Sequence, residues 1–406
     1  MTFSPSWPTR RARFMFSVRD VRGTDAPLAS ATKDGVSLRS DLDFSVWNPD
    51  SNVSNYKLVE SDDFVIGLRS FQHGISHSTV KGIVSPAYTV LRAAADVDPR
   101  FFRHYFRSSL LISQLANLTQ GIRQGQAIDI ETFRDLPLPL PPREEQRRIA
   151  DFLDAETARM DKLVLRQEQI AKKLDERERV QLDLAVDQLA EHWGVVPLRR
   201  FLLGVDQGTS PQAEAVPAGL DEWGVLKVSC LRPGRFIPDE NKRLPSDVEP
   251  DSKHEVQAGD LLITRANTPQ LVGSTAVVQE ARAKLLLSDK IFRVRLDRRM
   301  TGEFVAMVAR GTRIRDLCAA SSNGASQSMA NIRFEEVKTW PLPAADLDAQ
   351  NKAVRHVDQQ RAHLDGLRTK IARQNVLLAE RRQSLITAAV TGQFDVSTAS
   401  GRNVTE

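Results

Sequence analysis

Residues 143–191 combine one apolar stripe with an otherwise polar surface. They contain no glycine or proline and are rich in strong helix formers. Apolar side chains recur at intervals of three and four residues, with Glu156 and Gln167 as polar interruptions; they are Ile149, Leu153, Met160, Leu163, Ile170 and Leu174. This spacing predicts a helix about 70 Å long whose stripe must be covered by a partner.

A second stripe lies 204 residues further along the chain. Gln360 and Gln374 interrupt it, and its apolar members are Ala353, Val357, Leu364, Leu367, Ile371 and Leu378. The two segments align without gaps at this offset, with identical pairs that include Gln146/Gln350, Asp154/Asp358, Asp161/Asp365, Leu163/Leu367, Leu174/Leu378 and Ala185/Ala389. The chain is therefore predicted to consist of two repeated units, roughly 7–191 and 193–395, each a long variable region followed by a helix.

Each predicted helix has a single apolar stripe and therefore needs a partner helix. One such stripe alone is equally typical of a simple oligomerisation helix that pairs with a second molecule. Two in-register copies in one chain favour an intramolecular antiparallel pair, which relates the two units by an approximate two-fold axis. Polar residues in the seam penalise wrong registers and so suit a pair of defined length.

The variable regions read as mixed α/β. Short β-type runs at 64–66, 88–91, 261–264 and 291–294 lie among Gly, Pro, Asp and Asn, and helical stretches follow at 100–118 and 303–319. The predicted fold class is α+β, with two mixed α/β domains separated by two long antiparallel coiled-coil helices and a pseudo-two-fold internal repeat.

Composition narrows the functional classes. The chain has no apolar run long enough for a membrane span and no signal-peptide pattern, so a cytoplasmic location is expected. Cys230 and Cys318 lack nearby ligands and are expected to be reduced thiols. Residues 1–142 carry 16 Lys and Arg against 14 Asp and Glu, and residues 143–192 carry 10 against 13. Such small imbalances do not establish nucleic-acid binding, which depends on clustering.

Loops in the two variable regions carry Arg, Asn and Gln, the side chains that can bond bidentately to guanine or adenine edges. Each of these residues is individually more typical of a solvated loop, but they recur after matching strands and in matching glycine-containing loops. The candidate DNA-binding residues are Arg69, Gln72, His73, Arg123, Gln124, Gln126, Arg265, Asn267, Gln270, Asn323, Ser326, Gln327 and Asn331.

Two motifs give the chain a family resemblance. PLPLPPREEQRRIADFLD at 137–154 and LLAERRQSLITAAVTGQFDV at 377–396 resemble the helix junctions of specificity subunits from type I restriction-modification systems. The likeness spans roughly residues 7–396. It departs at Asp348-Ala349-Gln350, where the first copy has Glu144-Glu145-Gln146, and in the first copy, which lacks the Thr391-Gly392 ending.

The resemblance implies a domain assignment. Target-recognition domains would occupy residues 1–142 and 192–345, a central spacer helix 143–191, a distal spacer helix and tail 346–396, and a disordered tail 397–406. It implies that each recognition domain reads one half of a bipartite site in double-stranded DNA, and that the helices set the gap between the halves.

The resemblance also implies partners and places the cofactors on them. The helices would dock two methyltransferase (modification) subunits, which bind S-adenosylmethionine, and restriction/translocase subunits that use ATP and Mg would join the complex. No cofactor is expected on this chain, and no membrane partner.

The sequence offers little support for catalysis. Asn48-Pro49-Asp50 lacks the second proline and the ring of an amino-methyltransferase loop, and no GxxxxGK[ST] phosphate loop occurs. The acids in Pro238-Asp239-Glu240-Asn241-Lys242 are adjacent and would point apart on a strand. A coiled-coil DNA-binding scaffold or regulator without methyltransferase partners remains the alternative, and co-purification with a methyltransferase distinguishes the two.

Overall fold

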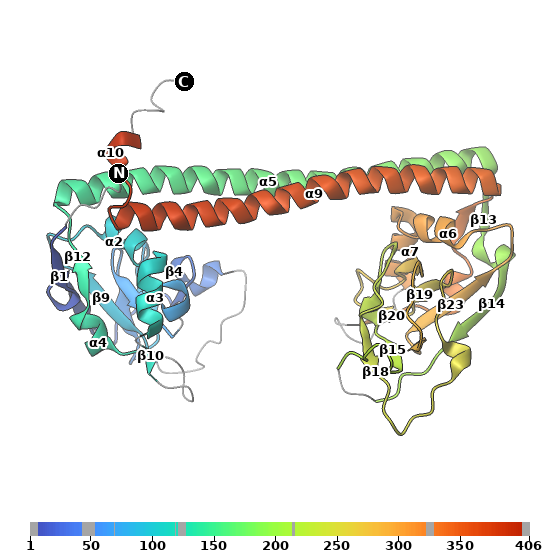
Figure 1. The fold of residues 1–406 in the computed structure, drawn as a ribbon, viewed down its shortest axis with the longest axis horizontal. Coiled ribbons are helices and arrows are strands. Elements are labelled where there is room, and N and C mark those ends of the chain that lie inside the picture. The colour runs from blue at the N-terminus through green and yellow to red at the C-terminus, as the bar shows by residue number, and fades with distance from the viewer. Residues whose placement is uncertain are drawn as a thin grey trace. The chain divides into compact units, whose positions relative to one another are not determined.

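The computed structural model of the chain describes residues 7–42, 53–68, 70–117, 119–120, 127–212, 216–321 and 329–399 (Figure 1). It divides into two compact units. Unit 1 comprises residues 1–168 and 372–406, and unit 2 comprises residues 169–371. Each unit therefore contains one block of strands and short helices together with part of both long helices.

Unit 1 is built on a four-stranded antiparallel sheet in the order β2-β9-β6-β7. Its strands are β2 (Phe16–Arg19), β9 (Thr89–Ala93), β6 (Phe64–Ile66) and β7 (Ser76–His77). The remaining strand pairs are β1 (Thr9–Arg11) with β12 (Pro137–Pro139), β3 (Ala29–Thr32) with β4 (Gly35–Leu38), β5 (Lys57–Val59) with β8 (Gly82–Val84), and β10 (Thr119–Gln120) with β11 (Ala127–Ile128). The short α-helices are α1 (Ser70–His73), α2 (Pro99–Tyr105), α3 (Ser109–Asn117) and α4 (Ile130–Asp135).

Unit 2 is built on a four-stranded antiparallel sheet in the order β14-β23-β19-β21. Its strands are β14 (Leu202–Gln207), β23 (Ile291–Leu296), β19 (Leu261–Thr264) and β21 (Thr275–Val277). The remaining strands are β13 (Val195–Pro197) with β25 (Pro341–Pro343), β18 (Asn241–Arg243) with β15 (Gly224–Leu226) and β22 (Leu285–Leu286), β16 (Leu231–Arg232) with β17 (Arg235–Phe236), and β20 (Ala266–Asn267) with β24 (Ala330–Asn331). The short α-helices are α6 (Gly302–Val308), α7 (Thr312–Ser321) and α8 (Phe334–Val337).

The two four-stranded sheets share one topology. If the four strands of each sheet are numbered in chain order, their order across the sheet is one, four, two, three. In each unit two short helices follow the sheet, then one more short helix, and then a proline-rich strand that pairs with the first strand of the unit. Both units thus mix helix and sheet, as the sequence predicts, and the order of their elements repeats.

Local signals explain where the helices after each sheet begin. Asp98 caps α2 by accepting a hydrogen bond from the Arg100 backbone N–H at 2.9 Å, and Pro99 occupies the first helical position, where no N–H is needed. Thr301 caps α6 by accepting from the Phe304 backbone N–H at 3.2 Å.

The two long helices are α5 (Arg143–Trp193) and α9 (Leu347–Val390). The prediction was 143–191 for the central helix and 346–396 for the distal helix together with its tail. The proline block ends at Pro142, directly before α5. Gly194 and Gly392 follow the helices with φ of 72° and 70°, a conformation that favours glycine and ends a helix. The chain then forms α10 (Val396–Ala399), so residues 397–399, expected in a disordered tail, are helical; residues 400–406 lie outside the described residues.

Within each unit α5 and α9 lie side by side and run in opposite directions (Figure 1). In unit 1 the beginning of α5 shares a core with the end of α9, where Leu153 and Ile386 are buried together. In unit 2 the end of α5 meets the beginning of α9, where Leu182 and Val357 share the other core. Gln167 donates its amide N–H to Gln374 Oε1 at 2.9 Å. The polar interruptions of the two stripes therefore bond to each other and help to fix the register.

The seam between the helices differs from the prediction at two positions. The expected seam residues Ile149, Leu153, Met160, Leu174, Val357 and Leu364 are buried, and Leu367, Ile371 and Leu378 are half-buried. Leu163 and Ile170, however, are 41% and 49% exposed. Thr157, Val164 and Ala171 face inward instead. The prediction was wrong for Leu163 and Ile170 because each precedes another apolar residue, so hydrophobicity alone does not choose between the neighbours.

Neither long helix nor any other helix in the described ranges has the length and apolarity needed to cross a bilayer. Cys230 and Cys318 are buried free thiols, as expected. Burial raises the pKa of the Cys318 thiol to about 11 and raises that of Cys230 as well. Neither thiol is poised for nucleophilic chemistry, because the reactive thiolate is disfavoured.

Candidate nucleic-acid interface and its helical support

In unit 2 the structure brings together candidate residues that are far apart in the sequence. Strand β20 pairs with β24, which places Ala266 opposite Asn331 and Asn267 opposite Ala330. Arg265, just before β20, is bonded through its backbone to both neighbouring segments: its N–H donates to Lys290 O at 2.8 Å and its C=O accepts from Ile332 N–H at 2.9 Å. The side chains of Arg265 and Asn331 are exposed on these adjoining strands, as a base-contacting pair requires.

The other two candidates of this region have different surroundings. Gln270 is exposed, and its backbone carbonyl accepts a hydrogen bond from Arg315 at 2.8 Å. Asn267 is only 7% exposed; its Oδ1 accepts from the Thr268 backbone N–H at 2.9 Å, while its Nδ2 has no partner among the described residues. The Asn267 side chain is therefore buried rather than presented to a base, and the prediction of a base contact at this position was wrong for the structure described.

In unit 1 the described candidates lie on a short helix rather than on the expected turn. Gln72 and His73 belong to α1, which follows β6, and both side chains are exposed. The remaining candidates of the two units, Arg69, Arg123, Gln124, Gln126, Asn323, Ser326 and Gln327, lie outside the described residues.

His73 also borders a cavity of about 620 Å³ between α1 and the β3–β4 hairpin of unit 1. Hydroxyl groups and one lysine contribute much of its wall, including Ser30, Thr32, Lys33, Ser37, Ser70 and Tyr88. No sequence motif predicts this cavity. The Lys33-Asp34-Gly35 turn marks the hairpin, but residues from 30 to 88 meet only in the folded sheet.

We call the strands and short helices within residues 7–142 of unit 1 and within residues 194–345 of unit 2 the recognition blocks, after the domains that the resemblance predicts. Two buried glutamines join the long helices to these blocks in the same way. Gln146 Oε1 accepts from the Asp98 backbone N–H at 2.8 Å, and its Nε2 donates to the Pro141 carbonyl at 2.9 Å and the Asp96 carbonyl at 3.3 Å. Gln350 Oε1 accepts from the Thr301 backbone N–H at 2.9 Å, and its Nε2 donates to the Ala345 and Arg299 carbonyls, both at 2.8 Å. Each glutamine thus ties the start of a long helix to the start of the short helix that follows its sheet.

A second pair of contacts links each recognition block to the far end of the other long helix. Asp183 of α5 accepts from the Thr312 backbone N–H at 2.8 Å and from its hydroxyl at 2.6 Å, and so caps α7. At the equivalent place in unit 1, Thr387 of α9 accepts from the Ser109 backbone N–H at 3.2 Å and caps α3. Asp183 and Thr387 are 204 residues apart. The alignment could have placed this pair, but the different side chains concealed its shared role.

Unit 1 adds an ionic contact between α2 and α5. His104 Nε2 lies 2.7 Å from Asp154 Oδ1, and Arg103 also pairs with Asp154. Burial lowers the pKa of His104, and the charges of Arg103 and Arg382 act in the same direction, against the hydrogen bond to Asp154. Burial tends to raise the pKa of Asp154, but its bond to His104 and the charge of Arg103 outweigh burial, and its pKa is lowered. The interface therefore holds a neutral imidazole beside a carboxylate.

The lowered pKa of His104 predicts acid sensitivity. An unfolded histidine takes up a proton near pH 6.5, whereas the buried His104 resists protonation, so the unfolded chain binds more protons and stability falls as the pH drops below about 6.5. His104→Gln should reduce the slope of unfolding free energy against pH by at most about 1.4 kcal/mol per pH unit, the value for one proton. Urea unfolding between pH 5.5 and 7.5 measures this slope.

The exposed His363 of α9 supplies the matched control variant, His363→Gln. His77 retains part of the slope in both variants, because burial lowers its pKa too. An equal slope for His104→Gln and the unsubstituted chain would show that His104 is not the responsible group.

Glu240, one of the two adjacent acids considered for catalysis, makes structural contacts. It accepts from the Ser229 hydroxyl at 2.6 Å and lies 3.9 Å from Lys227. In the part of the chain that the structure describes, no group of three or more His, Cys, Asp and Glu side chains is arranged to hold a metal.

Comparisons with known proteins agree with this architecture. Residues 58–172 match the family described as the type I restriction modification DNA specificity domain. Over 368 residues, 86% of this chain and 78% of the relative, the sequence is 23% identical to the type I restriction enzyme EcoKI specificity subunit of Escherichia coli strain K12. By these comparisons the chain is similar to the specificity subunits of type I restriction-modification systems.

Further relatives of this family cover different shares of the chain. The type I restriction enzyme EcoEI specificity subunit of Escherichia coli is 28% identical over 181 residues, which are 44% of this chain and 30% of that protein. The HsdS subunit of Thermoanaerobacter tengcongensis has the same fold with a TM-score of 0.52 at 18% identity, over 97% of this chain and 98% of that one.

One more solved chain superposes with a TM-score of 0.68 at 18% identity, over 97% of this chain and all of that one. It comes from a structure described as "Structural basis underlying complex assembly and conformational transition of the type I R-M system". At these identities the structural likeness concerns the fold.

Proposed function

We propose that the chain is the DNA-specificity subunit of a type I restriction-modification complex and has no catalytic role itself. Its target-recognition domains, residues 1–142 and 192–345, each read one half of a bipartite DNA site. The helices at 143–191 and 346–396 form an antiparallel coiled coil that sets the gap between the halves and docks two modification subunits. S-adenosylmethionine, ATP and Mg are bound by the partner subunits.

The observation that carries this proposal is the repetition of one topology with dissimilar exposed side chains. Both recognition blocks have the same sheet order and the same glutamine contact to a long helix, through Gln146 and Gln350. Two copies of one fold related by a pseudo-two-fold axis can present the same face to the two halves of a duplex, whose backbone has local two-fold symmetry. Different side chains on that face would then select different bases.

The alternative, a DNA-binding scaffold that acts without methyltransferase partners, uses the same fold. Co-expression with candidate modification subunits and purification through a tag on this chain distinguishes them. A stable complex that methylates DNA supports the proposal. A chain that binds DNA specifically and alone, and never recruits a methyltransferase, supports the alternative.

The exposed Arg265 provides a residue-level test. If Arg265 bonds a base edge, Arg265→Ala should weaken binding by about 1–3 kcal/mol, and only for the half-site read by residues 192–345. Competition binding with duplexes randomised in one half at a time measures this effect. The exposed Arg333, paired with Glu336 at 3.0 Å, gives a nearby control variant, Arg333→Ala. Unchanged base preference in Arg265→Ala would reduce Arg265 to a phosphate contact or to no contact.

A further inference from the structure

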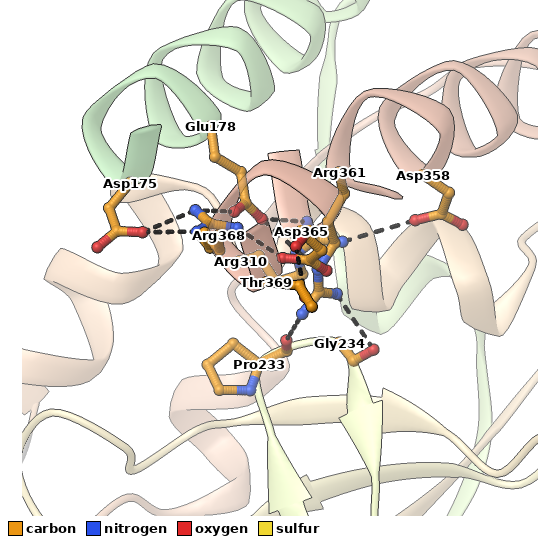
Figure 2. Close-up of polar contacts among 10 residues, drawn as sticks. All are labelled: Asp175, Glu178, Pro233, Gly234, Arg310, Asp358, Arg361, Asp365, Arg368 and Thr369. Carbon is orange, nitrogen blue, oxygen red and sulfur yellow. Dashed lines mark hydrogen bonds and ion pairs between the residues drawn. The ribbon is translucent and has the colours of Figure 1, made fainter. Parts of the chain in front are cut away.

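In unit 2 a half-buried network of charged side chains joins the recognition block to both long helices (Figure 2). Arg310 lies in the turn between α6 and α7, and its side chain is only 8% exposed. Its guanidinium bonds Glu178 of α5 at 3.1 Å and lies 3.7 Å from Asp358 of α9. Burial and the neighbouring Arg361 charge lower the pKa of Arg310, so its paired carboxylates are needed to keep it stable inside the protein.

Glu178 is the centre of this network, because three arginines converge on its carboxylate. Besides Arg310, Arg368 donates to Glu178 Oε2 at 2.8 Å and Arg361 Nε lies 3.6 Å from Oε1. Arg368 also bonds Asp175 of α5 at 2.7 Å and Asp365 of α9 at 2.6 Å. The two helices are thus tied to each other at the level where the recognition block meets them.

The network also reaches a second part of the recognition block. The turn between β16 and β17 approaches Arg361, whose guanidinium donates to the Pro233 carbonyl at 3.4 Å and the Gly234 carbonyl at 3.5 Å. Gly234 has a φ of 71°, and a Cβ there would lie 2.7 Å from Arg310 Cδ. A side chain at this position would have to displace Arg310 or Arg361, so the turn packs closely against both arginines.

Arg310 differs from the other polar links between this block and the helices. Gln350 connects the block to α9 and Asp183 connects it to α5, whereas Arg310 contacts both helices. The surrounding apolar core, which includes Leu182, Val308 and Ala309, is non-directional and does not strongly select one orientation of the block on the helices. A planar guanidinium between two carboxylates on different helices is geometrically selective.

The fold itself does not require this network, because unit 1 has the same topology without it. The position of Arg310 corresponds to Arg107, in the turn between α2 and α3, and the position of Glu178 corresponds to Arg382. The charge at the centre is therefore reversed, and Arg382 pairs with Asp161 instead. Unit 1 instead joins its block to α5 through Arg103 and His104, which pair with Asp154, the equivalent of Asp358. Among the described residues, an arginine that links the block to carboxylates of both helices is therefore particular to unit 2.

We infer that Arg310 is the positioning residue that fixes the orientation of the second recognition domain on the helix pair, and so determines how strictly the gap between the two half-sites is read. This inference rests on the proposed function. Arg310 touches no base in this account; it acts through the recognition domain that it holds. Loss of the network should leave base preference intact and make methylation less dependent on the length of the gap between the half-sites.

The test uses the full chain in complex with its modification subunits. Methylation is measured on duplexes that contain both half-sites with the natural gap or with gaps one or two base pairs longer or shorter. Arg310→Met keeps the aliphatic stem and removes the fork of donors. We expect methylation of the natural duplex to stay within about 3-fold, and methylation at gaps changed by one base pair to rise at least 10-fold, with unchanged half-site sequences.

Companion variants make each outcome decisive. Lys352→Met removes an exposed ion pair within α9 and should keep the natural gap dependence. If Arg310→Met does not fold, Arg310→Lys, which keeps the charge without the fork, decides the question with the same duplexes. Equal gap dependence in the folded Arg310 variant and the unsubstituted chain overturns the inference, and so does a uniform loss of methylation at every gap. An unsubstituted complex that ignores gap length overturns the proposed function instead.

Discussion

Removing residues 164–170 from α5 together with residues 371–377 from α9 should shift methylation to sites with a shorter gap and reduce it at the natural site at least 100-fold. The two deletions face each other, since Gln167 bonds Gln374 at their centres, and seven residues preserve the phase of the apolar seam. The loss of about 10 Å of helix corresponds to at most about 3 base pairs of DNA. Because a shorter gap also rotates one half-site around the DNA axis relative to the other, the twist of DNA opposes the full shift.

Controls separate spacing from damage to the helices. Deleting only one of the two segments should prevent correct pairing of the seam and abolish methylation at all gaps. Replacing both segments with other helix-forming sequences of equal length, with seam residues kept, should preserve the natural gap. Methylation at the natural gap by the doubly deleted protein would contradict a spacing role for the helices.

The second large effect concerns stability. Gln350→Leu should lower the free energy of unfolding by about 3 kcal/mol or more, because it strands the Thr301 N–H and the Ala345 and Arg299 carbonyls in a buried position. Gln146→Leu should have a similar cost in unit 1, since its side chain makes the same three bonds. Chemical unfolding of the purified chain measures both.

An exposed glutamine of the same helix provides the control for this experiment. Gln359 lies on the surface of α9, so Gln359→Leu should change the unfolding free energy by less than about 0.5 kcal/mol. Equal stabilities for Gln350→Leu and Gln359→Leu would show that the glutamine bonds do not hold the recognition block to the helix.

Much of this architecture could be predicted because it is encoded by spacing along one helix. The repeat offset, the proline block before Arg143 and the stripe through Leu153 and Met160 identify both long helices almost to their ends. The stripe failed at Leu163 and Ile170, where two adjacent apolar residues compete and the partner helix makes the choice. A hydrophobic pattern specifies a face only to within one residue.

The contacts that join the recognition blocks to the helices could not be predicted in the same way. Asp183 and Thr387 cap equivalent helices with different chemistry, and Arg310 meets Glu178 across 132 residues of sequence. Such pairs depend on three-dimensional proximity rather than on local propensity. The base-contacting residues are harder still to predict, because any exposed loop with Arg, Asn or Gln satisfies the chemical requirement, and Asn267 proved to be buried.

The most direct test of the central claim is base-resolution mapping of methylated positions in DNA treated with the chain and its modification subunits. Every methylated site should consist of two different short sequences separated by a gap of fixed length and unspecified sequence. Exchange of residues 192–345 for the corresponding domain of a relative should change only one of the two sequences. Methylation at a single uninterrupted sequence, or a change in both halves after that exchange, would contradict it.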